Sequence, residues 1–542
     1  MREKIFVPFA LAISMILWVL TIATTHITTI PIGTIGGLAL SLPLFYWFGL
    51  VLLIVSIVCL INNKELVERK TFFILPLLLL LAYFLWIPYF VEDLPRILST
   101  FVHMGEAKQI ITDLAITPDS VFYHHWPGML LVTAELLLLS GLQDVVLLKI
   151  LPILFSLLYL IPLYLIFSLF FKEKIYPFLG LVLFILGNWI GQTHWSIQNP
   201  IFFVYLVMVY FILRVILEKE ELTPELSLAL LAMLFVLVSS HAITPYVLFF
   251  NLLFLGVMVK NKPLIYSSLF IAAVYLFWQF TFAGYPLVKF VPLLIKKMLS
   301  ITDIFLFNEG LGRIALTSIY NISRVFLKGL MLFSFAALTG YALWKLWKTH
   351  TTDVRKKIKF YGVWLASVLF FGLTLRFGSE IIERTILFAL VPCILLILFA
   401  YQQKMVSTGI VLYIIFASVL FVPVFYFNES FETVTATQVD SRVYVKTYFD
   451  PEKYTVMDQR LLLWLYDMNY DIERILSSTD FTLRDLPEVD VYIVDEQSKA
   501  MIDSYYEGGS TAYETIEDGE NNDYNKVYAD TEQGAVYTKN DE

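Results

Sequence analysis

Long apolar stretches separated by short polar ones dominate the chain. A helix needs roughly twenty apolar residues to cross the hydrocarbon core of a bilayer, so such stretches are typical of membrane-spanning helices. The pattern predicts about 13 spanning helices within residues 1–427. Their expected ranges are 5–25, 37–61, 71–90, 146–171, 175–190, 199–217, 224–240, 242–259, 263–281, 326–347, 359–376, 384–401 and 406–427. We therefore expect an all-α polytopic membrane protein.

One shorter apolar run, residues 127–142, does not fit this series. It is too short to cross comfortably, and Glu135 interrupts it. We expect a helix that lies at the membrane interface or dips into it. The run belongs to a long loop, residues 91–145, and residues 282–325 form a second long loop on the same expected side.

Composition supports this class. Of the 542 residues, 58% are hydrophobic and only 15% are charged, whereas about a quarter are charged in soluble domains. Cys59 and Cys393 both lie in apolar runs, which favours core thiols over a disulfide or a metal site. The chain has no Walker loop, no G-x-G-x-x-G after a strand, no H-E-x-x-H and no C-x-x-C. A nucleotide-sugar site of the soluble kind therefore has no support, and we expect no nucleic-acid partner.

Basic residues predict the orientation, because Lys and Arg concentrate in cytoplasmic loops. With a cytoplasmic N-terminus, the inner segments carry 18 Lys and Arg residues and the outer segments of the membrane part carry 11. An odd number of spans then places residues 428–542 outside. The expected location is the plasma membrane, with many passes.

The C-terminal part, residues 428–542, differs in composition from the rest. It carries 26 Asp and Glu residues against 9 Lys and Arg. Two β-branched runs, Arg442–Lys446 and Asp490–Val494, predict strands; residues 458–470 show helical periodicity, and residues 526–537 resemble a hairpin. We expect a small extracytoplasmic α/β domain with a mobile loop at 515–525. Its acidity indicates a solvated surface, and a binding role is the alternative.

Polar groups gather on the expected outer side. Glu92 and Asp93 directly follow an apolar run, and Tyr123 to Gly128 (YHHWPG) close the same loop. Six of the seven histidines are on that side: His26, His103, His124, His125, His194 and His241. The expected lining of one outward-facing pocket consists of His124, His125, Trp126, His194, Gln198 and His241. Charges in the middle of the spans, which would mark an ion path, are nearly absent.

Each of these features has a structural alternative. Glu92 and Asp93 could end a helix, and His124, His125 and Trp126 could anchor the chain in the aromatic belt. His194 and His241 could bind helix-end carbonyls. Arg376 and Arg384 could extend along the lipid to the interface. Their coincidence on one side favours a site.

The layout resembles a family. An apolar helix ends in an acidic residue, an amphipathic loop follows, and a Tyr-x-x-Trp-Pro-Gly turn (Tyr123, Trp126, Pro127, Gly128) leads into an interfacial helix. This is similar to the GT-C fold glycosyltransferases, which include protein O-mannosyltransferases, aminoarabinose transferases and oligosaccharyltransferase catalytic subunits. Residues 193–200, 240–245 and 384–388 look most like archaeal members of that fold. The chain departs from the family's pattern in three ways. Its acidic motif is Glu-Asp, two helices precede the helix that leads into the acidic loop, and its C-terminal part contains no W-W-D-x-G motif.

The resemblance implies a transferase that takes a sugar from a polyprenyl- or dolichyl-phosphate carrier at the outer leaflet. The acceptor would be a glycan, a lipid or a protein. Asp93 is then the candidate base, with Glu92 as the substitute. Arg376 and Arg384 are the candidates for binding the lipid phosphate, followed by Lys296 and Lys297. A divalent cation, Mg²⁺ or Mn²⁺, held by Asp93 with His194 or with His124 and His125 is left open, because hard cations prefer oxygen ligands.

Two other classes remain open. A transporter or flippase for a lipid-linked or cell-envelope substrate would also use a polytopic scaffold, but it predicts midplane polar sites and an internal repeat. The third class is a non-catalytic assembly protein of the cell surface whose outer domain binds.

Overall fold

The structure is a computed structural model of the whole chain. The residues that it describes are 2–542 apart from 29, 31–33, 35, 119–121, 190–192, 219–222, 285–318, 350, 375–377, 427–432, 467, 468, 470, 471, 474–487, 504–510, 512, 514–516, 518–523, 531–533 and 540–542.

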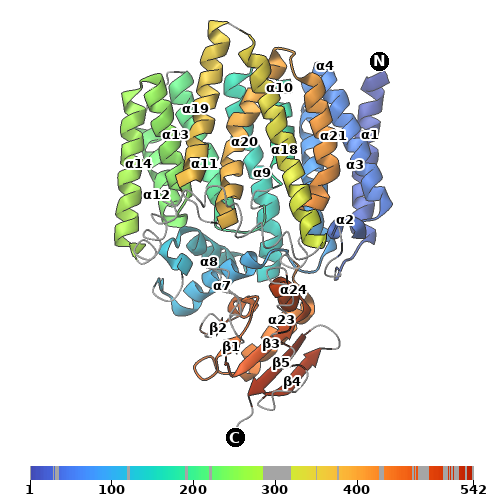
Figure 1. Ribbon diagram of the computed structural model, residues 1–542, viewed down its shortest axis with the longest axis vertical. Coiled ribbons are helices and arrows are strands. Elements are labelled where there is room, and N and C mark those ends of the chain that lie inside the picture. Colours follow the sequence, from blue (N-terminus) through green and yellow to red (C-terminus); the bar gives the residue numbers. More distant parts are fainter. Residues whose placement is uncertain are drawn as a thin grey trace.

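Apolar helices form the larger part of the molecule (Figure 1). In chain order they are α1 (Arg2–Thr24), α2 (Leu38–Ser41), α3 (Leu44–Asn62), α4 (Lys64–Val67), α5 (Lys70–Leu81), the π-helix η1 (Ala82–Trp86), α6 (Ile87–Val91), α7 (Leu98–Asp113), the 3-10 turn η2 (Phe122–His125), α8 (Gly128–Ser140), α9 (Asp144–Phe170), α10 (Ile175–Gly187), α11 (Gln198–Leu217), α12 (Pro224–Ser240), α13 (Thr244–Val259), α14 (Lys262–Thr281), α18 (Ile319–Trp347), α19 (Thr352–Thr374), α20 (Gly378–Gln402) and α21 (Ser407–Phe425).

Every expected span overlaps a helix of the described chain, and the span expected at 37–61 is divided between α2 and α3. Nine helical segments of the described chain are long and apolar enough to cross a membrane. Three further expected spans, α10, α12 and α13, are shorter, and α19 begins with a charged stretch. The helical membrane class is therefore confirmed, whereas the number of spans stays a prediction.

The interfacial helix expected at 127–142 is α8. Together with α7 it lies across one end of the upright helices, between them and the C-terminal part (Figure 1). Both helices therefore cover the end of the bundle.

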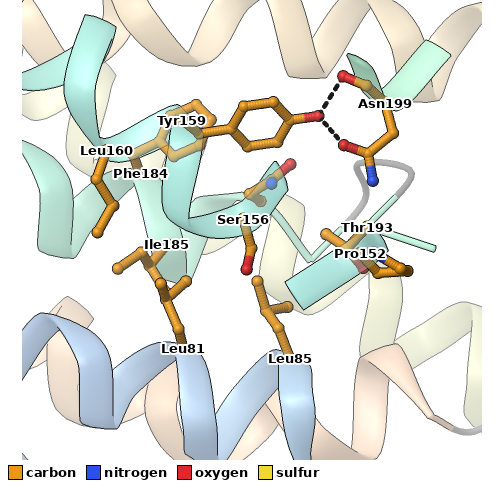
Figure 2. A pocket seen from close by; sticks show the side chains of 11 residues that line it. Leu81, Leu85, Pro152, Ser156, Tyr159, Leu160, Phe184, Ile185, Thr193 and Asn199 are labelled. Atoms are coloured by element: carbon orange, nitrogen blue, oxygen red, sulfur yellow. Dashed lines mark hydrogen bonds between the residues drawn. The ribbon is translucent and has the colours of Figure 1, made fainter. Parts of the chain in front are cut away.

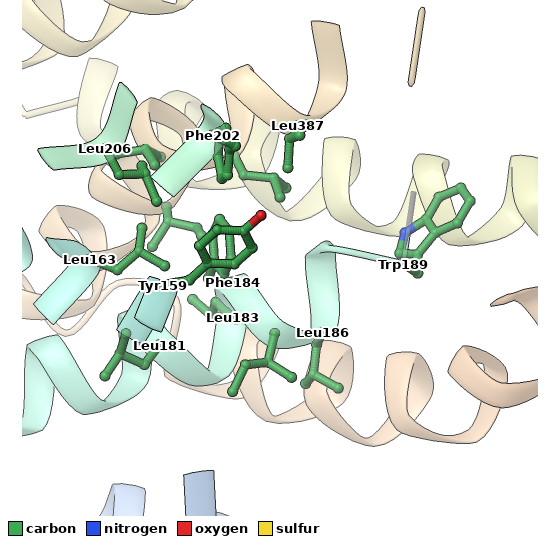
Figure 3. Close-up of a cluster of buried hydrophobic side chains, with 14 of the residues drawn as sticks. Tyr159, Leu163, Leu181, Leu183, Phe184, Leu186, Trp189, Phe202, Leu206 and Leu387 are labelled. Atoms are coloured by element: carbon green, nitrogen blue, oxygen red, sulfur yellow. The ribbon is translucent and has the colours of Figure 1, made fainter. Parts of the chain in front are cut away.

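The centre of the bundle is closely packed and almost entirely apolar. Figure 3 shows Tyr159 of α9 among side chains from α10, α11 and α20, including Phe184, Phe202 and Leu387. Phe202 stacks on Phe184, and its ring lies edge-on to Tyr159, 5.4 Å between centroids. Such burial removes large aromatic surfaces from lipid and water and fixes the relative positions of the four helices. The helix ends, where the polar groups lie, are thereby held in place.

Helix α5, the π-helix η1 and α6 form one continuous segment, Lys70–Val91. The hydroxyl of Tyr46 donates to the Tyr83 carbonyl (2.6 Å), and the hydroxyl of Tyr83 donates to the Ser14 carbonyl (2.7 Å). The side chain of Tyr83 lies against Gly49, where an added Cβ would be 1.9 Å from its hydroxyl. These contacts hold the segment against α1 and α3, and the segment ends directly before Glu92.

The C-terminal part contains a five-stranded sheet in the order β2-β1-β3-β5-β4. Its elements are α23 (Ala436–Tyr448), β1 (Val456–Met457), η3 (Leu462–Leu465), β2 (Ile472–Glu473), β3 (Val491–Asp495), α24 (Glu496–Asp503), β4 (Tyr524–Asp530) and β5 (Gly534–Lys539). Strands β1, β2 and β3 are parallel, and β5 pairs antiparallel with both β3 and β4. The strand near 490–494 and the antiparallel pair near 526–537 are confirmed.

Other expectations for this part differ from the structure. The run Arg442–Lys446 is not a strand but lies inside helix α23, which starts with a capping box between Thr435 and Gln438. In the described part of the range 458–470, the short 3-10 helix η3 is present instead of a full helix. Most of the expected mobile loop, 515–525, is outside the described residues, and Tyr524 already belongs to β4.

A buried ionic network explains why α23 is a helix. Arg442 lies on its inner face and contacts Asp458 (2.6 Å) and Asp495 (2.8 Å), and all three side chains are completely buried. The Asp458 carboxylate also accepts from the backbone N–H of Leu463 (2.8 Å). A buried charge is tolerated only with such partners, so the position of Arg442 overrides the β propensity of its neighbours.

Candidate active site

The two acidic residues after α6 have different environments. Glu92 is 8% exposed, and the Nε of Arg96 donates to both oxygens of its carboxylate (2.9 and 2.7 Å). The ammonium of Lys149 donates to the Glu92 carbonyl (2.7 Å). Asp93, in contrast, points to an accessible position, and its side chain is 48% exposed. Only Asp93 therefore presents an accessible carboxylate.

Backbone contacts fix this loop. Glu92 has extended backbone angles, which end α6, and forms a bridge with Ile27. The Ile27 N–H donates to the Val91 carbonyl (2.7 Å). The segment between α1 and α2 is thereby fastened to the acidic loop, and it places His26 Nε2 3.4 Å from Asp93 Oδ1.

A small pocket opens beside the acidic pair. It is lined by Ile27, Thr28, Ile30, Glu92, Asp93, Leu94, Arg96, Thr433, Val434 and Ala436. The guanidinium of Arg96 lies 5.4 Å from the ring of Tyr426, at the end of α21. Three parts of the chain that are far apart in sequence therefore meet at Asp93: the segment after α1, the acidic loop and the start of the C-terminal part.

A second polar group, the histidine cluster, consists of His103 and Glu106 of α7 together with His194, His241 and Arg384; all of these except Arg384 are buried. His103 Nδ1 is 3.0 Å from a carboxylate oxygen of Glu106, one helical turn along α7, and the imidazole lies edge-on to Tyr123. His194 Nε2 is 3.3 Å from the Ser99 hydroxyl. His241 Nδ1 accepts from the Thr244 N–H (3.2 Å). The cluster connects α7 with the segment before α11, the end of α12 and the second turn of α20.

Burial controls the charge of this cluster. Desolvation, together with the neighbouring His103, lowers the pKa of His194 to about 3. Desolvation, Arg384 and His103 lower the pKa of His241 well below its ordinary value. Both imidazoles are therefore neutral at pH 7 and can accept or donate a hydrogen bond without carrying charge.

Four residues of the YHHWPG turn, His124 to Pro127, are buried. His124 Nδ1 accepts from the Thr117 N–H (3.0 Å), its Nε2 donates to the Glu106 carbonyl (3.2 Å), and burial lowers its pKa. His125 Nδ1 donates to the Phe282 carbonyl (3.1 Å). Trp126 is 5% exposed. These contacts fasten the turn between α7 and the end of α14; a role for the three residues in a substrate pocket stays a prediction.

Gln198, at the start of α11, is 2% exposed, and within the described residues neither of its amide atoms has a hydrogen-bond partner. Its neighbour Asn199 belongs to a mainly apolar pocket between α5, η1, α9, α10 and α11 (Figure 2). There the Tyr159 hydroxyl donates to the Asn199 carbonyl (2.7 Å) and side-chain oxygen. The polar end of this pocket, Thr193 and Asn199, adjoins His194 and Gln198 in sequence.

Some predicted site residues are not placed. Arg376, Lys296 and Lys297 lie outside the described residues. Across the described ranges, no group of three or more His, Cys, Asp or Glu side chains could hold a metal ion. The carboxylate of Asp93 lies beside His26, whereas the imidazole of His194 lies beside Ser99. These two candidate metal ligands therefore have different neighbours.

Sequence reasoning missed four residues near the candidates: Arg96, Lys149, His26 as the neighbour of Asp93, and Glu106. The i, i+3 spacing of His103 and Glu106 on an amphipathic stretch could have indicated their pairing. The contact between His26 and Asp93 joins positions 67 residues apart and has no such signal.

No protein-family model matches this chain, and no curated protein matches its sequence.

Proposed function

We propose that the protein is a membrane glycosyltransferase, which moves a sugar from a polyprenyl- or dolichyl-phosphate donor to an acceptor hydroxyl on the extracytoplasmic face. The observation that carries this proposal is the accessible Asp93 carboxylate at the end of the helix bundle, beside a pocket and next to a Glu92 that Arg96 already neutralises. The layout of helix, acidic loop and interfacial helices supports it, because it resembles the GT-C fold.

The reaction needs a basic centre for the acceptor and cations for the donor. Because Glu92 is engaged by Arg96, Asp93 is the carboxylate that can support removal of the acceptor proton. Arg384 lies at the same end of the bundle, where its charge contributes to the low pKa of His241. Among the cations predicted to bind the donor phosphate, Arg384 is the one that the structure describes. Arg376, Lys296 and Lys297 are further candidates from the sequence. The apolar helices offer a lipid-facing surface for the polyprenyl chain.

Replacing each acid by its amide tests this assignment. We expect Asp93→Asn to fold normally and to lose at least about a hundredfold in turnover, since loss of acid–base catalysis typically lowers rates by on the order of 10²–10⁴. Glu92→Gln should mainly lower the thermal stability, because it leaves the Arg96 guanidinium buried without its carboxylate.

The measurement is transfer of radiolabelled sugar from polyprenyl-phosphate sugars by the purified full-length protein in detergent or liposomes, alongside thermal unfolding. Wild-type protein that shows no transfer with any such donor would contradict the proposed function. Full turnover in Asp93→Asn would place the catalytic centre elsewhere, while transport of the donor without transfer would favour a flippase.

A further inference from the structure

The segment after α1 brings a histidine to the acidic loop. His26 Nε2 lies 3.4 Å from Asp93 Oδ1, and the two side chains are 69% and 48% exposed. The backbone beside them is held by the N–H of Ile27, which donates to Val91, and by the bridge between Ile27 and Glu92. The position of His26 is therefore fixed by hydrogen bonds of the main chain, while its imidazole remains accessible to a substrate.

A carboxylate beside one nitrogen of an imidazole gives the ring a defined chemical role. In the tautomer that carries its proton on Nε2, facing the carboxylate, the lone pair of Nδ1 is directed away from Asp93. Imidazole is a stronger base than a carboxylate. A carboxylate that orients a histidine base is a recurring arrangement in acyl-transfer enzymes on unrelated folds.

We infer that His26 is the catalytic base of the site and that Asp93 is its positioning residue. This inference rests on the proposed function. In the reaction, the acceptor O–H bond breaks, and its proton goes to Nδ1 of His26. The acceptor oxygen forms a bond to the anomeric carbon of the sugar. The bond between that carbon and the phosphate oxygen breaks, and its electron pair leaves with the lipid phosphate. The imidazolium, held by the Asp93 carboxylate, then releases its proton to water.

The exposure of the pair makes this inference testable. Exposed ion pairs contribute only about 0–1 kcal/mol to stability. Removing His26 should therefore leave folding nearly unchanged, and any large loss of turnover cannot be attributed to unfolding. The exposed pair of Lys4 and Glu65, near the other end of α1, provides a matched control.

The experiment measures sugar transfer by the full-length protein for His26→Gln, Asp93→Asn, the double variant and Lys4→Gln. We expect His26→Gln to lose on the order of a hundredfold in kcat with little change in KM. The double variant should be no worse than the slower single variant, because the two residues act as one unit. Lys4→Gln should retain the activity of the wild type.

Chemical rescue distinguishes a base from a structural contact. In His26→Ala, added imidazole should restore part of kcat, since the exposed position can admit the small molecule, whereas the same addition should leave Asp93→Ala unrescued. If the wild type transfers sugar and His26→Gln keeps full turnover, or if imidazole rescues nothing, the inference is wrong while the proposed function stands. A wild type without transfer activity overturns both.

Discussion

At the scale of single residues, burial decides the charge of the histidines at the end of the helix bundle. His194 is 8% exposed, and desolvation together with His103 lowers its pKa to about 3. Among the described residues, the hydrogen-bond partner of its imidazole is the neutral Ser99 hydroxyl, 3.3 Å from Nε2. Protonation of this side chain is therefore opposed by the folded state.

Acidification should consequently destabilise the protein. Above the ordinary histidine pKa of about 6.5, His194 is neutral in both states. Below it, the unfolded chain binds the proton and the folded chain does not, so stability falls as the pH falls towards the folded pKa of about 3. At pH 5 this difference amounts to about 2 kcal/mol. His194→Gln should lose this share of the pH dependence.

Thermal unfolding in detergent at pH 7 and pH 5 provides the measurement. The variant should have a smaller difference between the two midpoints than the wild type. An identical difference would show that His194 is protonated freely in the folded protein.

The sequence identifies which polar residues lie at helix ends, but not how they are paired. It gives Glu92 and Asp93 as alternatives, although Arg96 pairs with the Glu92 carboxylate and Lys149 donates to the Glu92 carbonyl. Their partners depend on how the loop bends after α6, and hydrophobic periodicity contains no information on that bend. The contact of His26 with Asp93 is hidden for the same reason.

At the scale of elements, close contact between α8 and the end of α12 holds α8 on the bundle. Gly128 starts α8, and a Cβ added there would lie 2.2 Å from the Ser240 hydroxyl and 2.8 Å from that of Ser239. Glycine in the Trp-Pro-Gly turn therefore permits an approach that no larger residue allows without movement.

Gly128→Ala should lower stability by about 1–3 kcal/mol, the usual range for overpacking. Gly362→Ala, inside α19, is the control, because its added Cβ would meet nothing within 4 Å. Alanine there should be neutral or stabilising, since it is the better helix former by roughly 1 kcal/mol. Thermal unfolding of the two variants tests the difference; equal midpoints would mean that Ser239 and Ser240 move aside freely.

The expected spans of the membrane part were predictable because each one contains an apolar run of sequence. The C-terminal part was less predictable. Its strand Val491–Asp495 is a short buried run that the pattern indicates. The run Arg442–Lys446 has the same β-branched composition but forms part of a helix. The contacts of Arg442 with Asp458 and Asp495 decide this case. Such long-range pairing of buried charges has no local signature.

At the scale of the whole molecule, the N-terminus and the C-terminal part lie at opposite ends of the helix bundle (Figure 1). Helix α7 connects the bundle with the C-terminal part: Lys108 pairs with Asp144 (2.8 Å), and Gln109 donates to the Asn469 side chain (3.2 Å). The acidic loop and the C-terminal part therefore share one side of the molecule. The distribution of Lys and Arg predicts that this side is extracytoplasmic.

Labelling of single cysteines in intact cells tests the orientation on which the site depends. In a background of Cys59→Ser and Cys393→Ser, we expect Lys453→Cys to react with an impermeant maleimide, because its side chain is 72% exposed in the C-terminal part. Glu65→Cys, 78% exposed near the other end of the bundle, should react only after the cells are permeabilised. The impermeant reagent does not cross the bilayer. Because the two positions have similar exposure, a difference in labelling reports the side of the membrane on which each one lies. The reverse pattern would put Asp93, His26 and Arg384 on the cytoplasmic side, where a donor presented at the outer leaflet could not reach them.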